Sequence, residues 1–174
     1  MFIYNSIVID FSLDNKYIFL IIKNKFFKKK VINLQRSEDL PNLFYKFIKS
    51  KQIKIDNSFN IFVNVGPGNL IPIRNSIVFA KTLSLITGCS IIGFSNYELL
   101  KNMKKKANRA LLSTSSKNIL LDLYKKKVKK IEASEISKFQ FLKIKINYNV
   151  KILEKLILSN KFEKKVFPIS YSDI

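Results

Sequence analysis

The chain has 174 residues, of which 47% are hydrophobic, and it carries a net charge of +20. Fifteen Phe and seven Tyr supply enough apolar volume for a folded core, which excludes a disordered tail. The chain has no histidine and one cysteine, Cys89, so an intrachain disulfide, a Cys/His zinc site and a Ser-His-Asp triad are excluded. No segment has the pattern of a signal peptide or the length of a membrane span. We therefore expect a cytoplasmic protein with no membrane partner and no metal.

The positive charge comes almost entirely from lysine. Of the 32 basic residues only Arg36, Arg74 and Arg109 are arginine, the residue preferred for bidentate phosphate contacts. This composition favours solvated lysine faces over a dedicated nucleic-acid site. Residues 1–100 carry 13 basic and 6 acidic side chains, whereas residues 101–174 carry 19 and 6, so any cationic surface that serves a function is expected in the C-terminal part. The candidate RNA contacts there are Lys125, Lys126, Lys127, Lys129 and Lys130.

The first third of the chain predicts three strands. Apolar runs at 6–10 and 17–22, separated by the turn residues Asp14 and Asn15, indicate a hairpin. A third strand is expected over 26–33, where three consecutive lysines are typical of an exposed edge. The chain therefore begins with three consecutive strands.

Helices and strands then alternate. The predicted elements are a helix over 38–50 capped by Ser37, a strand over 59–65, a helix over 72–87 closed by Gly88, a strand over 90–93, and a helix that starts at a capping box over Ser95–Glu98. A hairpin-led mixed sheet continued by crossover helices is the half-unit of the actin-like (ribonuclease H-like) ATPase fold. The predicted class is therefore α/β, with an actin-like ATPase-type fold.

The pattern changes after residue 106. Short strands are predicted over 109–113, 117–124, 128–133 and 139–147, and a helix over 150–158. A polar stretch at 101–108 separates the two patterns. We therefore predict an N-terminal subdomain over 1–104 and a shortened, strongly basic C-terminal subdomain of related type over 105–174.

Three ordered blocks of sequence resemble the TsaB family. The stretch 63–100 contains Gly66-Pro67-Gly68 after a strand, then Arg74, an apolar helix ending in Gly88, and the step Gly93-Phe94-Ser95. The blocks 7–12 and 36–40 resemble the family's opening Ile-Asp-Thr-Ser and its His-Ser-Glu-x-Leu. The chain departs from the pattern at Phe11, Arg36, Asn69-Leu70-Ile71-Pro72 and Ser115-Ser116-Lys117, which stand where the family has Thr, His, Ser-Phe-Thr-Gly and Asp-Ala-Arg.

The resemblance implies a non-catalytic subunit without a cofactor. A TsaB-type protein binds the TsaD-type transferase, and with a TsaE-type ATPase the complex transfers a threonylcarbamoyl group to N6 of adenosine 37 in ANN-reading tRNAs. Asp10 and Ser12 are then remnants of a phosphate site, and Gly66-Pro67-Gly68 is a tight turn, since no Gly-Lys-Ser/Thr follows it. In the family, the helices that correspond to 38–50 and 72–87 meet the partner. The predicted interface residues are Leu40, Leu43, Phe44, Phe47, Ile73, Arg74, Ile77 and Ala80.

The sequence leaves two other functions open. An RNA-binding module that uses the basic second half would explain the charge directly. A degenerate small-molecule kinase of the same fold would need a complete phosphate-binding set and a catalytic carboxylate, neither of which the sequence provides. Whether the chain forms a homodimer when alone, and whether tRNA contacts it directly, is also left open.

Overall fold

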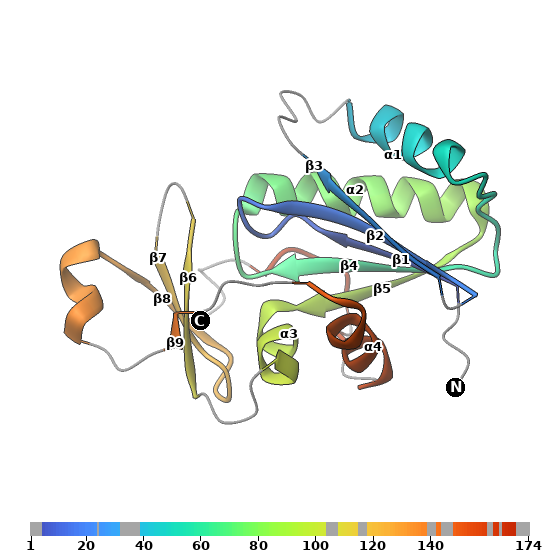
Figure 1. Ribbon diagram of the computed structural model, residues 1–174. Coiled ribbons are helices and arrows are strands. Elements are labelled where there is room, and N and C mark those ends of the chain that lie inside the picture. The colour runs from blue at the N-terminus through green and yellow to red at the C-terminus, as the bar shows by residue number, and fades with distance from the viewer. Residues whose placement is uncertain are drawn as a thin grey trace.

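The computed structural model describes residues 5–23, 25–31, 39–103, 108–114, 118–138, 142–143, 148–159, 162–163 and 165–169. Its first sheet has the strand order β3-β2-β1-β4-β5 (Figure 1). The strands are β1 (Ser6–Asp10), β2 (Lys16–Ile22), β3 (Lys25–Val31), β4 (Asn60–Gly66) and β5 (Ser90–Ser95). β1 pairs antiparallel with β2 and parallel with β4, so the hairpin-led mixed sheet is confirmed.

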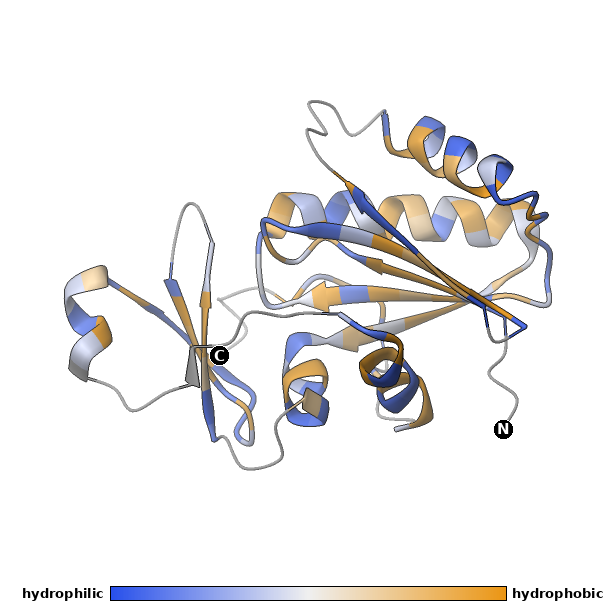
Figure 2. Ribbon diagram, viewed as in Figure 1, coloured by the Kyte–Doolittle hydropathy of each residue, from blue (hydrophilic) through white to orange (hydrophobic). Residues whose placement is uncertain are grey.

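Helices cover both faces of this sheet. α1 (Asp39–Ser50) and α2 (Leu70–Thr87) lie on one face, and α3 (Asn96–Met103) and α4 (Val150–Leu158) lie on the other (Figure 1). The alternation of side chains along each strand sends Ile7 and Ile9 of β1 into the cluster under α1 and α2, and Val8 into the cluster over α3 and α4. Figure 2 shows the hydrophobic residues that run along these buried strands. The sheet is therefore buried on both faces, as its continuous apolar runs predict.

The second sheet repeats the topology of the first. It contains β6 (Arg109–Ser113), β7 (Asn118–Asp122), β8 (Lys127–Ile131) and β9 (Leu142–Lys143) in the order β8-β7-β6-β9. β6 pairs antiparallel with β7 and parallel with β9, as β1 does with β2 and β4. A 3₁₀ helix, η1 (Ala133–Lys138), stands between β8 and β9, where the first half has α1 between β3 and β4. The expected second, abbreviated half of related type is therefore present.

The end of the chain returns to the first sheet. Leu153 and Leu156 of α4 lie in the same core cluster as Val8 of β1. Beyond α4, a β-bridge joins Glu163 to Gly93 of β5. The predicted division after residue 104 assigned this segment to the second subdomain, but the apolar face of α4 is buried against the first sheet. The second body therefore consists of β6 to β9 and η1.

Two helix starts differ from the prediction. α2 begins at Leu70, two residues earlier than expected, after Asn69 as N-cap. β5 continues to Ser95, whose hydroxyl has no hydrogen-bond partner, so the predicted capping box of α3 does not form. Ser37, Glu38 and the segments 139–141 and 144–147 of the predicted elements lie outside the described residues.

Candidate functional site

Polar side chains gather at the carboxyl ends of β1 and β4, which meet at the same edge of the sheet because the two strands are parallel. The four residues are Asp10 at the end of β1, Ser12 just after it, Asn64 in β4 and Asn96 at the start of α3. All four are at most 2% exposed. The structure thus joins the two predicted residues to two asparagines that the sequence analysis missed. The sequence feature that could have predicted this cluster is the polar Asn64 inside the apolar run of β4.

Ser12 is the centre of a closed hydrogen-bond network. Its backbone N–H donates to Asp10 Oδ1 over 2.8 Å, and its hydroxyl donates to the same oxygen over 2.7 Å. The side-chain amides of Asn64 and Asn96 donate to Ser12 Oγ over 3.2 and 3.0 Å. The amide of Asn64 also donates to Asn96 Oδ1 over 2.8 Å. Each of the four side chains therefore has a protein partner and needs no ligand to satisfy it.

The Gly66-Pro67-Gly68 turn packs directly onto this network. The Gly66 N–H donates to Asn64 Oδ1 over 2.8 Å, and the side-chain amide of Asn96 donates to the Pro67 carbonyl over 2.7 Å. A Cβ at position 68 would lie 2.1 Å from the Ser12 carbonyl oxygen, so only glycine permits this approach. The turn thus covers the carboxyl ends of β1 and β4, and Gly68 lies directly against the backbone of Ser12.

Burial raises the pKa of Asp10 above its ordinary value, and hydrogen bonds from Ser12 and Asn64 oppose this rise only in part. The carboxyl group therefore favours its neutral form more than an exposed aspartate does. In the described part of the chain, no three His, Cys, Asp or Glu residues are arranged to hold a metal ion. What the geometry supports for Asp10 and Ser12 is a structural role in joining β1, β4 and α3.

Six of the eight predicted interface residues lie in the core of the chain. They are Leu40, Phe44, Phe47, Ile73, Ile77 and Ala80, each at most 6% exposed. A side chain this deeply buried beneath α1 and α2 meets no partner while the fold is intact, so the structure corrects the contact positions on these helices. Leu43 is half-buried against the same core, and Arg74 is exposed on α2. For these two residues the interface role stays a prediction.

The outer face of α2 carries a different set of apolar residues, which we call the α2 stripe. It consists of Ile71, Val78, Leu85 and Ile86, which are 72%, 64%, 86% and 76% exposed. Ile71, Val78 and Leu85 are spaced by seven residues, so they share one side of the helix over about 21 Å. Tyr45 of the neighbouring α1 is also exposed. The seven-residue spacing of these exposed residues, on a different side of the helix from the buried Ile73 and Ile77, is the sequence feature that could have predicted the stripe.

By length and composition alone, α2 is apolar enough to cross a membrane. Its inner face, however, contributes Ile73, Ile77 and Ala80 to the core of the first sheet. A bilayer would have to strip these side chains from that core and accommodate the exposed Arg74 and Lys81 on the same helix. The helix therefore fits a protein partner better than a lipid one.

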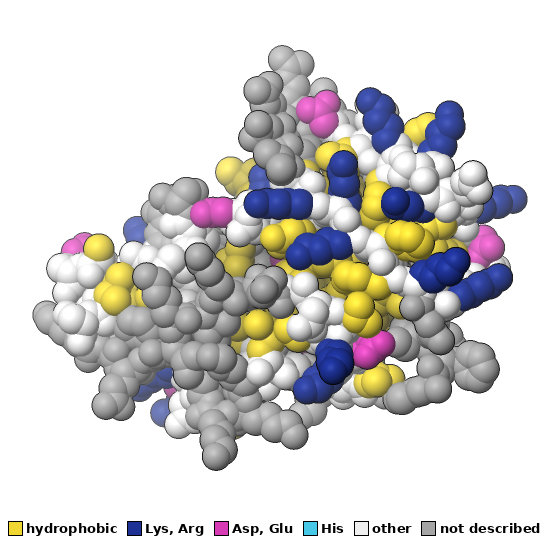
Figure 3. Space-filling view, viewed as in Figure 1, with side chains coloured by type: hydrophobic (Ala, Val, Ile, Leu, Met, Phe, Trp, Pro, Cys, Tyr) yellow, Lys and Arg dark blue, Asp and Glu magenta, His cyan; other side chains and the backbone are white. Residues whose placement is uncertain are grey.

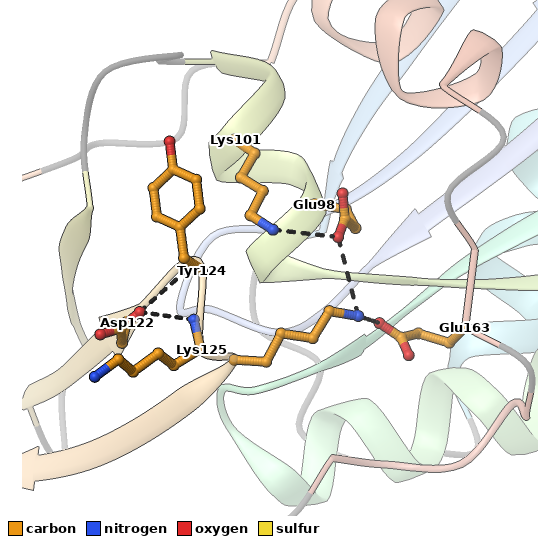
Figure 4. A network of polar contacts seen from close by, with 7 residues as sticks. Glu98, Lys101, Asp122, Tyr124, Lys125 and Glu163 are labelled. Atoms are coloured by element: carbon orange, nitrogen blue, oxygen red, sulfur yellow. Dashed lines mark hydrogen bonds and ion pairs between the residues drawn. The ribbon is translucent and has the colours of Figure 1, made fainter.

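The five lysines predicted as RNA contacts divide into two groups. Lys126, in the β7–β8 turn, lies 3.4 Å from Glu163 and 3.9 Å from Glu98, and Lys101 lies 3.8 Å from the same Glu98 oxygen (Figure 4). Lys126 thus ties the second sheet to α3 and to the C-terminal segment. Lys129 lies 3.7 Å from Glu135. Lys125, Lys127 and Lys130 are exposed, and RNA contact by any of the five stays a prediction.

The fold has known counterparts. YeaZ from Pseudomonas aeruginosa matches with a TM-score of 0.64 and 10% identity over 97% of this chain and 100% of that one. An uncharacterized protein with similarity to peptidase YeaZ, also from Pseudomonas aeruginosa, matches with a TM-score of 0.64, 9% identity and the same coverage. No protein-family model and no curated protein matches the sequence. At these identities the likeness shows the fold alone: the chain has the fold of YeaZ, which is a TsaB-type protein.

Proposed function

We propose that this chain is the non-catalytic scaffold subunit of a cytoplasmic tRNA-modifying complex. In this role it binds a TsaD-type transferase, which makes N6-threonylcarbamoyladenosine at position 37 of ANN-reading tRNAs, together with a TsaE-type ATPase. The TsaB-like fold and the three sequence blocks support the proposal. The observation that carries it is the α2 stripe, because a soluble protein seldom leaves such a row of aliphatic side chains uncovered.

The stripe has the form of a helix-packing surface. Aliphatic residues at seven-residue spacing pack between the side chains of an opposing helix, as in helical bundles. Phe44 of α1 and Phe79 of α2 meet edge to face with ring centroids 5.3 Å apart, which fixes the two helices side by side. Tyr45, next to Phe44 on α1, is exposed and adds a second apolar side chain outside the core. A partner that presents a similar helix pair would complete a four-helix bundle.

The polar cluster supports a silent role. An acyl transferase needs an activated nucleophile or a paired acid and base that can reach the substrate. Asp10 and Ser12 are at most 2% exposed, and the turn at Gly66–Gly68 covers them, so neither meets a substrate. The chemistry is then assigned to the TsaD-type partner, and this chain contributes a surface.

The test is co-expression with the TsaD-type transferase from the same genome, followed by size-exclusion chromatography and a transfer assay on an ANN-reading tRNA. We expect a stable complex of the two proteins, and no threonylcarbamoyl transfer by this chain alone. A homodimer through the α2 stripe that dissociates when the transferase is added is consistent with the proposal. Failure to associate with the transferase, or robust transfer by the isolated chain, would overturn it.

A further inference from the structure

The exposed edge of the first sheet is lined with lysine. β3 is the outermost strand in the order β3-β2-β1-β4-β5 and pairs only with β2 among the described residues. Lys25, Lys28, Lys29 and Lys30 of this strand are all exposed. Because successive side chains of a strand point to opposite faces, Lys28 and Lys30 lie on the α3/α4 side of the sheet and Lys25 and Lys29 lie on the α1/α2 side. The edge is therefore cationic on both faces.

One of these lysines, and one lysine that follows α1, lie over aromatic rings. The Lys28 ammonium lies 4.4 Å from the ring centroid of Tyr17, which stacks on Phe19. On the other face, Lys51, just beyond α1, lies 5.5 Å from the ring of Phe27 in β3. A lysine whose charged end rests over a ring has less freedom than a fully solvated one, so ordering it on an anion costs less entropy. The rings thereby restrict the positions of the Lys28 and Lys51 ammonium groups along the edge.

The charge around β3 is also less neutralised than the charge around β8. Residues 16–54 carry eleven basic and two acidic side chains, whereas residues 118–138 carry six and three. In the described part of the chain, no carboxylate lies within ion-pair distance of a β3 lysine, while Lys126 and Lys129 of the second sheet are both paired. Figure 3 shows Lys and Arg side chains over the first sheet and its helices, with few acidic ones among them. The lysines around β3 are thus a second cationic surface, beside the one predicted in the C-terminal part, and fewer acidic side chains accompany them.

We propose that this edge binds the phosphate backbone of RNA. The β3 edge is defined as Lys25, Lys28, Lys29, Lys30 and Lys51. Lysines two apart on a strand lie about 7 Å from each other, comparable to the separation of successive phosphates in a nucleotide chain. Lys28 and Lys30, the pair at this spacing, can therefore contact two successive phosphates. A lipid surface fits less well, because no large exposed hydrophobic side chain lies on β2 or β3 to enter it.

This interaction goes beyond the scaffold role and does not depend on the transferase. A strand edge rich in lysine also prevents sheets from joining edge to edge, which is the competing explanation for these residues. The two explanations differ in their prediction for RNA. An edge that only prevents aggregation should bind RNA no better than any other acidic polymer. A phosphate-binding edge should prefer RNA, and removal of its lysines should lower both the affinity and its salt dependence.

The test uses the full chain and an ANN-reading tRNA transcript as the probe, with affinity measured over a series of salt concentrations. The edge variant is Lys28→Gln/Lys29→Gln/Lys30→Gln. The control is Lys81→Gln/Lys151→Gln/Lys155→Gln, which removes the same charge from exposed positions on α2 and α4. We expect the edge variant to weaken binding at least about tenfold at low salt and to reduce the slope of log K against log salt by roughly 2 to 3. The control is expected to change both quantities much less.

Four results would overturn the proposal. The first is the absence of tRNA binding by the wild-type chain at low salt. The second is an equal loss in the edge and control variants, which would assign binding to net charge. The third is competition by polyglutamate as effective as by tRNA at equal charge. The fourth is binding to phosphatidylserine vesicles without binding to tRNA. Circular dichroism of both variants should match wild type, because all the substituted lysines are exposed.

Discussion

Two neighbouring residues of α2 test which side of the helix is buried. Ile77 is 4% exposed and lies in the core beneath α2, whereas Val78 is 64% exposed in the α2 stripe. Both are β-branched, so replacement by Ala raises the intrinsic helix propensity in both variants. Ile77→Ala leaves a cavity and should destabilise the fold by about 2–5 kcal/mol. Val78→Ala should change the free energy of unfolding by at most about 0.5 kcal/mol.

Thermal unfolding of the isolated chain measures this difference. For a chain of this length, about 1 kcal/mol shifts the melting temperature by roughly 2–4 °C, so Ile77→Ala should melt roughly 4–20 °C below wild type. Val78→Ala should melt within about 2 °C of wild type. Equal losses in the two variants, or a larger loss at Val78, would refute the orientation of α2. The α2 stripe would then be buried in the fold and could not bind a partner.

Three further perturbations follow from the contacts. Burial raises the pKa of Asp10, so its contribution to stability is greatest below the unfolded pKa of 3.8 and is lost as pH rises through the raised value. Asp10→Asn should therefore flatten the loss of urea stability as pH rises above 3.8, and an unchanged pH profile would contradict this. Gly68→Ala should lower the melting temperature sharply, since its Cβ meets the Ser12 carbonyl at 2.1 Å, and a wild-type melt would rule out that packing. Lys126→Met should cost less than about 1 kcal/mol, an effect that shrinks in high salt, whereas a larger, salt-independent cost would contradict a half-exposed ion pair.

The sequence predicted the first sheet and its helices well, because the strands are short apolar runs and α1 has a clear helical period. Apolar runs such as 17–22 belong to strands buried on both faces, and the stripe of α1 at Leu40, Phe44 and Phe47 is buried as a single amphipathic face. The second sheet was predicted from its succession of short strands, whereas its strand order, which repeats that of the first sheet, was seen only in the structure. Local periodicity was sufficient wherever one face of an element is apolar and the other is polar.

The orientation of α2 was beyond this reasoning. This helix is apolar nearly all round, so the sequence could not separate Ile77, which faces the sheet, from Val78, which faces solvent. The return of α4 to the first sheet and the tie from Lys126 to Glu98 and Glu163 join residues far apart in the chain, and no local pattern encodes them. The asparagines of the polar cluster were missed for the same reason, since Asn64 and Asn96 act through tertiary contacts.

The most direct test of the scaffold role compares one substitution at two exposed leucines. Leu85 lies in the α2 stripe, and Leu158 lies at the end of α4 on the opposite face of the sheet; they are 86% and 45% exposed. We would measure the affinity of Leu85→Glu and Leu158→Glu for the TsaD-type transferase by calorimetry, with melting temperatures as the folding control. We expect Leu85→Glu to weaken binding at least about tenfold, which corresponds to about 1.4 kcal/mol, and Leu158→Glu to bind as wild type. Wild-type affinity in a folded Leu85→Glu variant, or equal weakening in both variants, would contradict it.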